Sequence, residues 1–344
     1  MGHAPDVLPE ARLYHAAHRQ DLPRRLRRHR RLGRRRRTTT PRQRRSQGQH
    51  AGSQAIRQHR CPRGRRRNLR KYGRGGQPFF IACGFSKPHS PPTAPRKMFD
   101  LYDVDKIPLP ADFASKPTVP AGFPERSVPA RNGDLFIGRE ASPAQAREMK
   151  RAYWAAVSFV DAQVGRVLAA LDELGLRDNT IVVFWGDHGY HLGEKGKWSK
   201  HNSLWEVGLR VPYLISAPGV SANDKVCSRV VECMSMFPTL VDLCGLPTIA
   251  GQQGVSIAAL LRNPAAAWDR PAISVCYQQK ILGRSVRTDR WHYADWDEGR
   301  AGAMLIDCAN DPGEVRNLVN DPAHARTVAE MKKLLERLPP VAAR

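Results

Sequence analysis

An aspartate and a histidine lie next to each other at positions 187 and 188, shortly after the apolar run 180–184. The β-branched residues of this run are typical of a strand buried on both faces, which would place Asp187 and His188 at the strand's carboxyl end. In open α/β sheets, ligands bind in the crevice beyond that end. A carboxylate oxygen and an imidazole nitrogen are both metal-ligand atoms. The pair therefore predicts a metal site, while the alternative is a polar turn in which Asp187 caps backbone amides.

Three lysines follow this pair closely, at positions 195, 197 and 200. Cations beside a metal site suit an anionic substrate, because they offset its charge. The alternative for Lys200 is a solvated surface cation, which is the usual state of lysine, and we take that state as the default for Lys195 and Lys197. Two alternatives stay open for the histidines of the same stretch, His191 and His201: they shape the pocket or lie exposed.

A second candidate histidine lies in the segment 78–91, which reads Pro-Phe-Phe-Ile-Ala-Cys-Gly-Phe-Ser-Lys-Pro-His-Ser-Pro. Residues 78–84 predict a buried strand, and the prolines stiffen the loop that presents Lys87 and His89. An imidazole held in this way can give a proton or a hydrogen bond to a leaving group. The alternative for His89 is a loop histidine fixed by a local hydrogen bond.

One long helix must lead into the strand that carries Asp187. Ser142-Pro143 is a typical helix start, with a capping hydroxyl followed by proline at the first helical position. Apolar residues such as Met149 and Val157 then recur at three- and four-residue spacing, which predicts one buried helical face. Gly175 is placed to end the helix. The strand 180–185 follows, and residues 211–216 and 235–244 predict a further strand and a short helix.

The 344 residues suffice for one large α/β domain or two smaller ones. After about residue 268 the pattern changes to short apolar runs with turns between them, which predicts an antiparallel sheet. These runs are 273–277, 281–287, 291–294 and 303–306, and a final helix is expected at about 323–337. The sequence thus predicts three parts: an Arg-rich segment at 1–76, an α/β core at 77–267, and a subdomain with an antiparallel sheet and a helix at 268–344.

Four stretches, in order along the chain, resemble motifs of the sulfatase family within the alkaline-phosphatase-like superfamily. They are 78–91 with its Lys-Pro-His, the helix 153–174, the Asp-His-Gly stretch 184–200, and a C-terminal signature formed by 305–307, Asp311-Pro312, Glu314 and Asn317-Leu318. The likeness is greatest to the iduronate-2-sulfatase-like branch and covers roughly residues 77 to 338. Four ordered motifs are far more specific than a single match.

The resemblance implies a fold and a reaction. The fold is an α/β sandwich with a central, mostly parallel sheet and a smaller C-terminal α+β subdomain with an antiparallel sheet. The reaction is the metal-dependent hydrolysis of sulfate esters on sulfated saccharides. By resemblance, Asp187 and His188 hold one divalent ion, normally Ca²⁺, Lys200 contacts the sulfate, His89 assists the leaving group, and Lys87 supports substrate binding. A phosphate or phosphonate ester hydrolase of the same superfamily is the alternative.

One part of the family pattern is missing. Sulfatases use a Cys or Ser in a C/S-x-P-S-R motif, oxidised to formylglycine, whose hydrate attacks sulfur. The printed sequence has no such motif, and the string that begins at Cys61 fails on its proline position and lacks the serine. Two acidic ligands that the family supplies near its start are also missing, which leaves too few oxygens for Ca²⁺. We therefore expect the chain as printed to be truncated and inactive, and marginally stable because a strand of the family sheet is missing.

The net charge of +24 is concentrated in the first fifth of the chain. Residues 1–76 hold 24 Lys and Arg against three acidic residues, a net of +21, so the remainder carries only +3. This segment has little apolar periodicity and is expected to be disordered. Three interpretations remain: a polyanion-binding arm beside a hydrolase remnant, a transit peptide, or out-of-frame translation, which we favour. Nucleic acid is accordingly not an expected partner.

Location and assembly are left open by the sequence. Relatives in the resembled family are usually periplasmic, extracellular or lysosomal, but residues 1–30 contain no apolar segment typical of a signal peptide. No apolar run is expected to reach membrane-spanning length, so no membrane partner is predicted. The seven cysteines show no zinc-type spacing.

Overall fold

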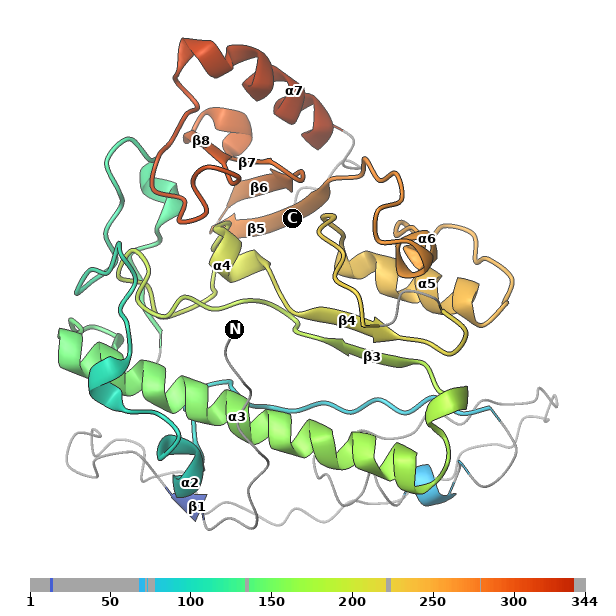
Figure 1. Cartoon of the computed structure of the whole chain (residues 1–344). Helices are drawn as coiled ribbons and strands as arrows, with labels where there is room; N and C mark the ends of the chain where they lie inside the picture. The colour runs from blue at the N-terminus through green and yellow to red at the C-terminus, as the bar shows by residue number, and fades with distance from the viewer. Residues whose placement is uncertain are drawn as a thin grey trace, which may run out of the picture. The chain divides into compact units, whose positions relative to one another are not determined.

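The computed structural model describes residues 68–71, 73, 78–133, 136–220, 224–278 and 280–336, together with the backbone of Leu13–Tyr14. The segment 1–76, for which the sequence predicts disorder or out-of-frame translation, lies almost entirely outside the described residues. The chain divides into two compact units, Met1–Asp100 with Ala155–Leu174, and Leu101–Trp154 with Gly175–Arg344. Each unit is described by itself, and their elements are labelled in Figure 1.

Up to Asp100, the described residues of the first unit contain little regular structure, whereas its other part, Ala155–Leu174, is almost entirely helical. Strand β1 (Leu13–Tyr14) pairs antiparallel with β2 (Ala94–Pro95), which leads into helix α2 (Arg96–Phe99). The prediction of a buried strand at 78–84 is wrong, because this run forms no strand and the Phe80 side chain is 76% exposed. A strand exists only through hydrogen bonds to a neighbouring strand, and no described segment supplies that neighbour.

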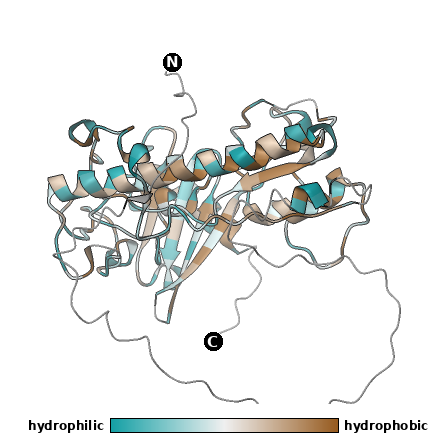
Figure 2. Cartoon of the chain, turned by 90° about the horizontal axis from the view of Figure 1, so that it is seen from below, coloured by the Kyte–Doolittle hydropathy of each residue, from teal (hydrophilic) through white to brown (hydrophobic). Residues whose placement is uncertain are grey.

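Helix α3 (Pro143–Glu173) confirms the predicted long helix. Its start is a reciprocal cap: the Gln145 backbone N–H donates to Ser142 Oγ over 3.3 Å, and the Ser142 N–H donates to Gln145 Oε1 over 3.1 Å. Gly175 follows with a φ of +63°, which favours glycine and ends the helix. Val157, predicted to face inward, is 44% exposed, whereas alanines 152, 155 and 156 are buried. Hydrophilic and hydrophobic residues both occur along its length (Figure 2).

By length and composition alone, α3 is long and apolar enough to cross a membrane. The expectation that no apolar run reaches that length is therefore wrong for this helix. The core helix of a soluble protein passes the same test, and α3 carries Asp161 and Arg166, whose charges would be costly in a bilayer. The helix is thus only weak support for a membrane span.

In the second unit, β3 (Val182–Trp185) pairs with β4 (Tyr213–Ser216). Both strands occur where the sequence predicts them, but β3 is not buried on both faces, since Phe184 is 38% and Trp185 48% exposed. The predicted central parallel sheet is not found among the described residues, whose strand pairings are all antiparallel. The reason is that β3 has only one described neighbour, and β4 runs opposite to it.

The predicted antiparallel sheet of the C-terminal part is confirmed. It consists of β5 (Ala272–Gln278), β6 (Ile281–Arg287), β7 (Trp291–Trp296) and β8 (Ala303–Asp307), paired in that order. Helix α7 (Ala325–Leu335) packs on one face through Met331 and Leu335. Figure 1 shows α7 beside this sheet, at the top of the view. Loops that carry Phe123 and Trp205 cover the other face. Successive side chains of a strand point to opposite faces, so both faces bury apolar residues.

The remaining helices of the second unit are short. They are α4 (Glu206–Leu209), α5 (Met236–Leu243) and α6 (Ala258–Arg262), with 3-10 turns at Val104–Lys106, Glu125–Ser127, Arg177–Asn179, Cys233–Ser235, Asp297–Gly299 and Pro322–His324. The predicted short helix at 235–244 is thus confirmed by α5. Helix α4 is the element on which the loop after β3 rests.

Candidate functional site

The side chains of Asp187 and His188 contact each other just after β3. Asp187 Oδ2 lies 3.6 Å from His188 Nε2, and Asp187 Oδ1 accepts from the His188 backbone N–H over 3.2 Å. His188 Nδ1 lies 2.8 Å from the Gly189 carbonyl oxygen. A carbonyl can only accept, so Nδ1 carries a proton, which leaves Nε2 as the ring atom that could act as a metal ligand. A carboxylate oxygen and this ring nitrogen thus lie side by side, which suits two ligands of one cation.

Glycine is required at position 189 because the chain passes directly against helix α4. A Cβ there would lie 2.1 Å from the Val207 carbonyl oxygen, and the Gly189 N–H donates to the Gly208 carbonyl over 3.0 Å. This contact holds the Asp-His-Gly turn on α4. The glycine of the motif is therefore explained by packing.

His191 is fully buried, whereas His201 is exposed. One ring nitrogen of His191, Nε2, lies 2.7 Å from Ser203 Oγ. Burial, with the charges of Lys195 and Lys197, lowers the pKa of His191 to about 3, so the ring is neutral at physiological pH. The sequence left open whether these histidines shape the pocket or lie exposed. In the structure His191 packs inside the loop, and His201 lies at its surface.

The expectation that Lys195 is a solvated surface lysine is wrong. Its side chain is only 3% exposed, and its Nζ lies 2.8 Å from Asp112 Oδ2. The same ammonium lies 4.1 Å from the centre of the Trp205 ring. Burial of this cation is possible because a carboxylate and an aromatic face replace its water.

Lys197 is also buried, against the same expectation. It is 1% exposed, and its Nζ donates to the backbone carbonyls of Pro129 and Arg131 over 2.7 and 2.6 Å. No carboxylate of the described residues pairs with it. Burial therefore lowers the pKa of Lys197 to about 8.

The segment 129–133 is clamped to the loop after β3 at two more points. Asn132 Nδ2 donates to the Gly196 carbonyl over 3.0 Å, and Asn132 Oδ1 accepts from the Trp198 N–H over 2.7 Å. A Cβ on Gly133 would lie 2.8 Å from the Trp198 carbonyl oxygen, so the two backbones are in close contact. Residues nearly seventy positions apart are thus fixed against each other.

Lys200 lies among other cations. Partial burial and the nearby basic groups of Lys200, His188, Arg131 and Lys197 lower the pKa of His201. We call these five residues, 131, 188, 197, 200 and 201, the cationic cluster. Within the part of the chain that the structure describes, no acidic side chain forms an ion pair with Arg131 or Lys200. The predicted metal ligand His188 and the predicted anion contact Lys200 thus both act electrostatically on His201.

Lys87 and His89 belong to the first unit and are described by themselves. Lys87 Nζ donates to the carbonyls of His89 and Pro91 over 3.1 and 2.6 Å, and partial burial lowers its pKa. The exposed His89 has Nδ1 2.9 Å from the Ser90 carbonyl oxygen. Lys87 thus shapes the loop, and the local hydrogen bond considered for His89 is present.

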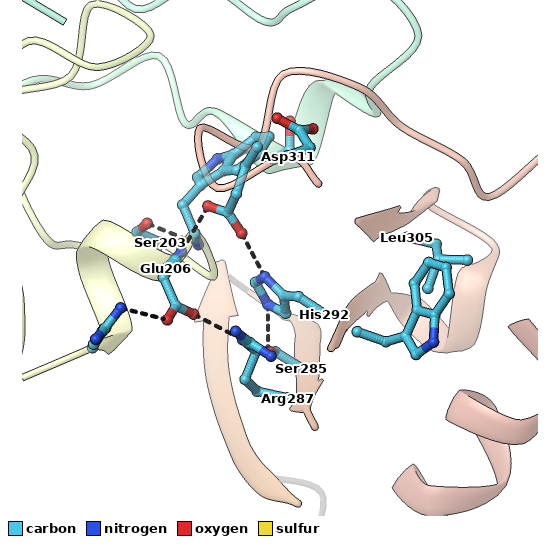
Figure 3. A network of polar contacts seen from close by, with 12 residues as sticks. Ser203, Glu206, Ser285, Arg287, His292, Leu305 and Asp311 are labelled. Carbon is cyan, nitrogen blue, oxygen red and sulfur yellow. Dashed lines mark hydrogen bonds and ion pairs between the residues drawn. The ribbon is translucent and has the colours of Figure 1, made fainter. Parts of the chain in front are cut away.

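The C-terminal signature contributes a buried polar network that the sequence analysis missed (Figure 3). Glu314 Oε1 lies 2.6 Å from His292 Nδ1, and Glu314 Oε2 accepts from the Glu206 N–H over 2.8 Å. The other ring nitrogen of His292 lies 2.9 Å from Ser285 Oγ. The Glu206 carboxylate lies 3.4 Å from Arg287 Nε. The network connects the signature to the first residue of helix α4.

Glu314 is held as a carboxylate within this network. Burial alone would raise its pKa, but the charge of His292 and the hydrogen bonds from His292 and Glu206 outweigh it and lower the pKa. Glu314, His292 and Cys308 bring possible ligand atoms within 4.8 Å of one another. However, burial raises the pKa of the Cys308 thiol, and the histidine and carboxylate already bond to each other. These contacts satisfy the groups without a metal.

Comparison with known proteins assigns the chain to a family. The sulfatase family pattern matches residues 67–246, and that of the N-sulphoglucosamine sulphohydrolase C-terminal part matches residues 193–340. A sulfatase of Formosa agariphila is 33% identical over 76% of this chain and 50% of its own length. Iduronate 2-sulfatase of Mus musculus is 34% identical over 53% of this chain and 38% of its own length.

The structural comparison agrees. A solved phosphonate monoester hydrolase from Silicibacter pomeroyi superposes with a TM-score of 0.65 at 25% identity, over 79% of this chain and 58% of that protein. The fold is therefore of the alkaline phosphatase/sulfatase type. The chain spans about half the length of the curated relatives it matches. With more than half of its residues matched by the family pattern, this chain belongs to the sulfatase family of the alkaline phosphatase superfamily.

Proposed function

We propose that this chain carries part of the site of an iduronate-2-sulfatase-like enzyme that hydrolyses sulfate esters on sulfated saccharides. The observation that supports this most is the pair formed by Asp187 Oδ2 and His188 Nε2, 3.6 Å apart at the end of β3, with Lys200 in the same cationic cluster. Similarity to iduronate 2-sulfatase supports the choice of a sulfated sugar over other sulfate esters.

Asp187 and His188 would hold the divalent ion, Ca²⁺ by family resemblance. When bound, that ion would draw electron density from a sulfuryl oxygen. Lys200 would offset the negative charge of the sulfuryl oxygens as the ester bond breaks. By family resemblance alone, His89 is the candidate proton donor for the leaving oxygen, and Lys87 holds its loop through the carbonyls of His89 and Pro91. Two protein ligands are fewer than Ca²⁺ takes, so we expect weak binding of the ion by this chain.

The printed sequence contains no C/S-x-P-S-R motif, and thus no precursor of formylglycine. We infer that the chain by itself binds its ligand but does not turn it over. Purified chain should release no more product from an aryl sulfate than a blank. Release above the blank that disappears in Lys200→Ala would contradict this inference and reveal another nucleophile.

Binding tests the proposed site directly. The probe is a methyl hexuronoside 2-sulfate, measured by titration calorimetry with Ca²⁺ present. Replacing Lys200 by Ala should weaken binding about tenfold or more, because a charge-assisted contact is lost. Lys225→Ala, at an exposed lysine of the same unit, is the matched control and should bind as the wild type does. Equal affinity of wild type and Lys200→Ala would contradict the assignment of Lys200.

A phosphate or phosphonate ester hydrolase is the second candidate, favoured by the structural similarity to the phosphonate monoester hydrolase. The Asp-His pair suits either ester. Competition between an aryl sulfate and an aryl phosphonate for the chain separates the two candidates. Tighter binding of the phosphonate would replace our first proposal by the second.

A further inference from the structure

The loop after β3 turns back on itself between the Asp-His pair and Lys200. At its tip the Gly193 backbone N–H donates to the Lys197 carbonyl over 2.9 Å, which closes a tight turn. Asp187 and His188 lie on the arm that enters this turn, and Lys200 lies on the arm that leaves it. The predicted metal ligands and the predicted sulfate contact therefore belong to opposite arms of one loop.

Tyr190 ties these two arms together. Its hydroxyl donates to the Trp198 carbonyl oxygen over 2.8 Å. Tyr190 follows His188 by two residues, and Trp198 precedes Lys200 by two residues. The hydrogen bond therefore lies where it can set the distance between the arm with the Asp-His pair and the arm with Lys200.

Trp198 is a fixed end for this hydrogen bond. Its side chain is fully buried, and the centroid of its ring lies 4.8 Å from that of the Phe136 ring. Its backbone N–H donates to Asn132 Oδ1 over 2.7 Å. Because Trp198 is held by both its ring and its backbone, loss of the bond to Tyr190 would release the first arm rather than the second.

The ring of Tyr190 is held in turn by Tyr153. Tyr153 lies in the part of α3 that belongs to the second unit, as does the loop after β3. The two rings stack with their centroids 5.6 Å apart and their planes at 26° to each other. Such a stack restricts the rotation of the Tyr190 side chain, and it thereby keeps the hydroxyl directed at the Trp198 carbonyl.

We propose that Tyr190 and Tyr153 are positioning residues, which hold the Asp-His pair at the distance from Lys200 that one sulfate ester can bridge. This inference rests on the proposed function, because it takes the ester to contact both the ion and Lys200. An ester that bridges two groups gains full affinity only when their separation matches it. Ca²⁺ and the sulfated sugar should therefore strengthen each other's binding, and this coupling should depend on the two tyrosines.

The experiment measures this coupling by titration calorimetry on the full chain. The affinity for a methyl hexuronoside 2-sulfate is determined with saturating Ca²⁺ and with EDTA. In the wild type Ca²⁺ should raise this affinity about tenfold. Tyr190→Phe keeps the ring and removes the hydroxyl, so the ratio should fall to about twofold or less. The affinity of this variant for each ligand alone should stay as in the wild type, which a merely structural role would not predict.

Further variants separate positioning from folding. Tyr153→Phe keeps the stacked ring and should keep most of the coupling, whereas Tyr153→Leu removes the ring and should lose it. The control is Thr239→Val, which removes a buried hydrogen bond of 2.6 Å to the Ser235 carbonyl elsewhere in the same unit. It should lower the melting temperature at least as much as Tyr190→Phe does, and still keep the full coupling.

The outcomes separate this inference from the proposed function. If the wild type binds both ligands without coupling, or if the coupling is the same in Tyr190→Phe, the positioning role is wrong and the function stands. An equal loss of coupling in Thr239→Val would show that coupling follows stability, and it also overturns the positioning role. Absence of wild-type binding to the sulfated probe overturns the proposed function and the positioning role with it.

Discussion

The two buried lysines show that residue type alone is a poor guide to exposure in this chain. Lysine is rarely buried, and nothing in the local sequence distinguishes Lys195 and Lys197 from the partly exposed Lys200. Their partners, Asp112 and the carbonyls of Pro129 and Arg131, come from a proline-rich stretch more than sixty residues earlier. Contacts of this range leave no signal in a single sequence.

The buried ammonium of Lys197 gives a pH dependence with a definite sign. Its pKa is about 8 in the folded chain against an ordinary 10.5. Between these values the unfolded chain binds more protons than the folded chain, so stability rises with pH. The free energy of unfolding of the wild type should gain on the order of 3 kcal/mol over Lys197→Met as the pH rises through this window. Urea unfolding of both proteins measures the gain, and parallel pH profiles would contradict it.

Calcium binding by Asp187 and His188 should be weak. With only two protein ligands, we expect a dissociation constant of about 10⁻³ M or above, as in the weakest calcium sites. Asp187→Asn should weaken binding about tenfold further, since it removes the only formal negative charge of the pair. Calorimetric titration with Ca²⁺ measures both. Asp178→Asn, at an exposed aspartate of the same unit, is the control, and an equal loss in the control would show that the ion binds elsewhere.

The helices and strands were predictable to the extent that their signals are local. The Ser142–Gln145 cap and Gly175 identify both ends of α3, and the short runs after residue 268 identify the four strands of the C-terminal sheet. The burial of β3 and the strand at 78–84 were not predictable, because burial and pairing depend on neighbours from elsewhere in the chain. For the same reason the position of Asp187 and His188 at the end of β3 was predictable, whereas the contact of the distant segment 129–133 with the loop after β3 was not.

The clamp between 129–133 and the loop after β3 can be tested without changing any charge. In Gly133→Ala the new Cβ would meet the Trp198 carbonyl at 2.8 Å, so one backbone must shift. We expect a loss of about 1–3 kcal/mol in unfolding free energy and weaker binding of the sulfated probe. Gly84→Ala, whose Cβ meets nothing within 4 Å, is the control. Unchanged stability and binding in Gly133→Ala would show that the clamp does not position the loop.

The C-terminal signature acts in this structure as a junction between elements. Glu314 links His292 of β7 to the first residue of α4, and Asn317 accepts from the Leu305 N–H of β8 over 3.0 Å while donating to the Gly122 carbonyl over 2.8 Å. Sequence resemblance located these residues but could not assign their contacts. The side chains of Glu314 and Asn317 form hydrogen bonds between elements, and these bonds stabilise the surroundings of α4.

Breaking the Glu314–His292 pair should therefore be costly. In Glu314→Ala the buried imidazole and the Glu206 N–H lose their partner, and we expect a loss of about 3–5 kcal/mol. His292→Ala in the same background should add little, because the two residues act together. Chemical unfolding of the single and double variants gives the coupling energy. Additive losses would contradict a paired network, and stabilisation of the wild type by Zn²⁺ would instead identify His292, Cys308 and Glu314 as a metal centre.

At the scale of the whole molecule, the net charge of +24 is the sum of two separate groups of basic residues. Residues 1–76 carry +21 with no described site, whereas the cationic cluster belongs to a part of the chain whose net charge is only +3. The fold type was predictable from four ordered motifs. The central parallel sheet was predicted from the resemblance to the family. It is not found in the described residues, because they contain no strand that pairs in parallel with β3.

Salt dependence should distinguish the Arg-rich segment from the site. A polyanion such as duplex DNA releases counterions when arginines neutralise its phosphates. If residues 1–76 act as the polyanion-binding arm, the affinity of the full chain for DNA should therefore fall about a thousandfold or more between about 50 and 200 mM salt. Replacing the four arginines 34–37 by Gln should reduce the slope of log affinity against log salt by about 3 to 4. The sulfated probe makes only a few charged contacts, and its binding should vary far less with salt and not change in this variant. An unchanged salt slope in the four-arginine variant would show that these arginines do not contact the phosphates.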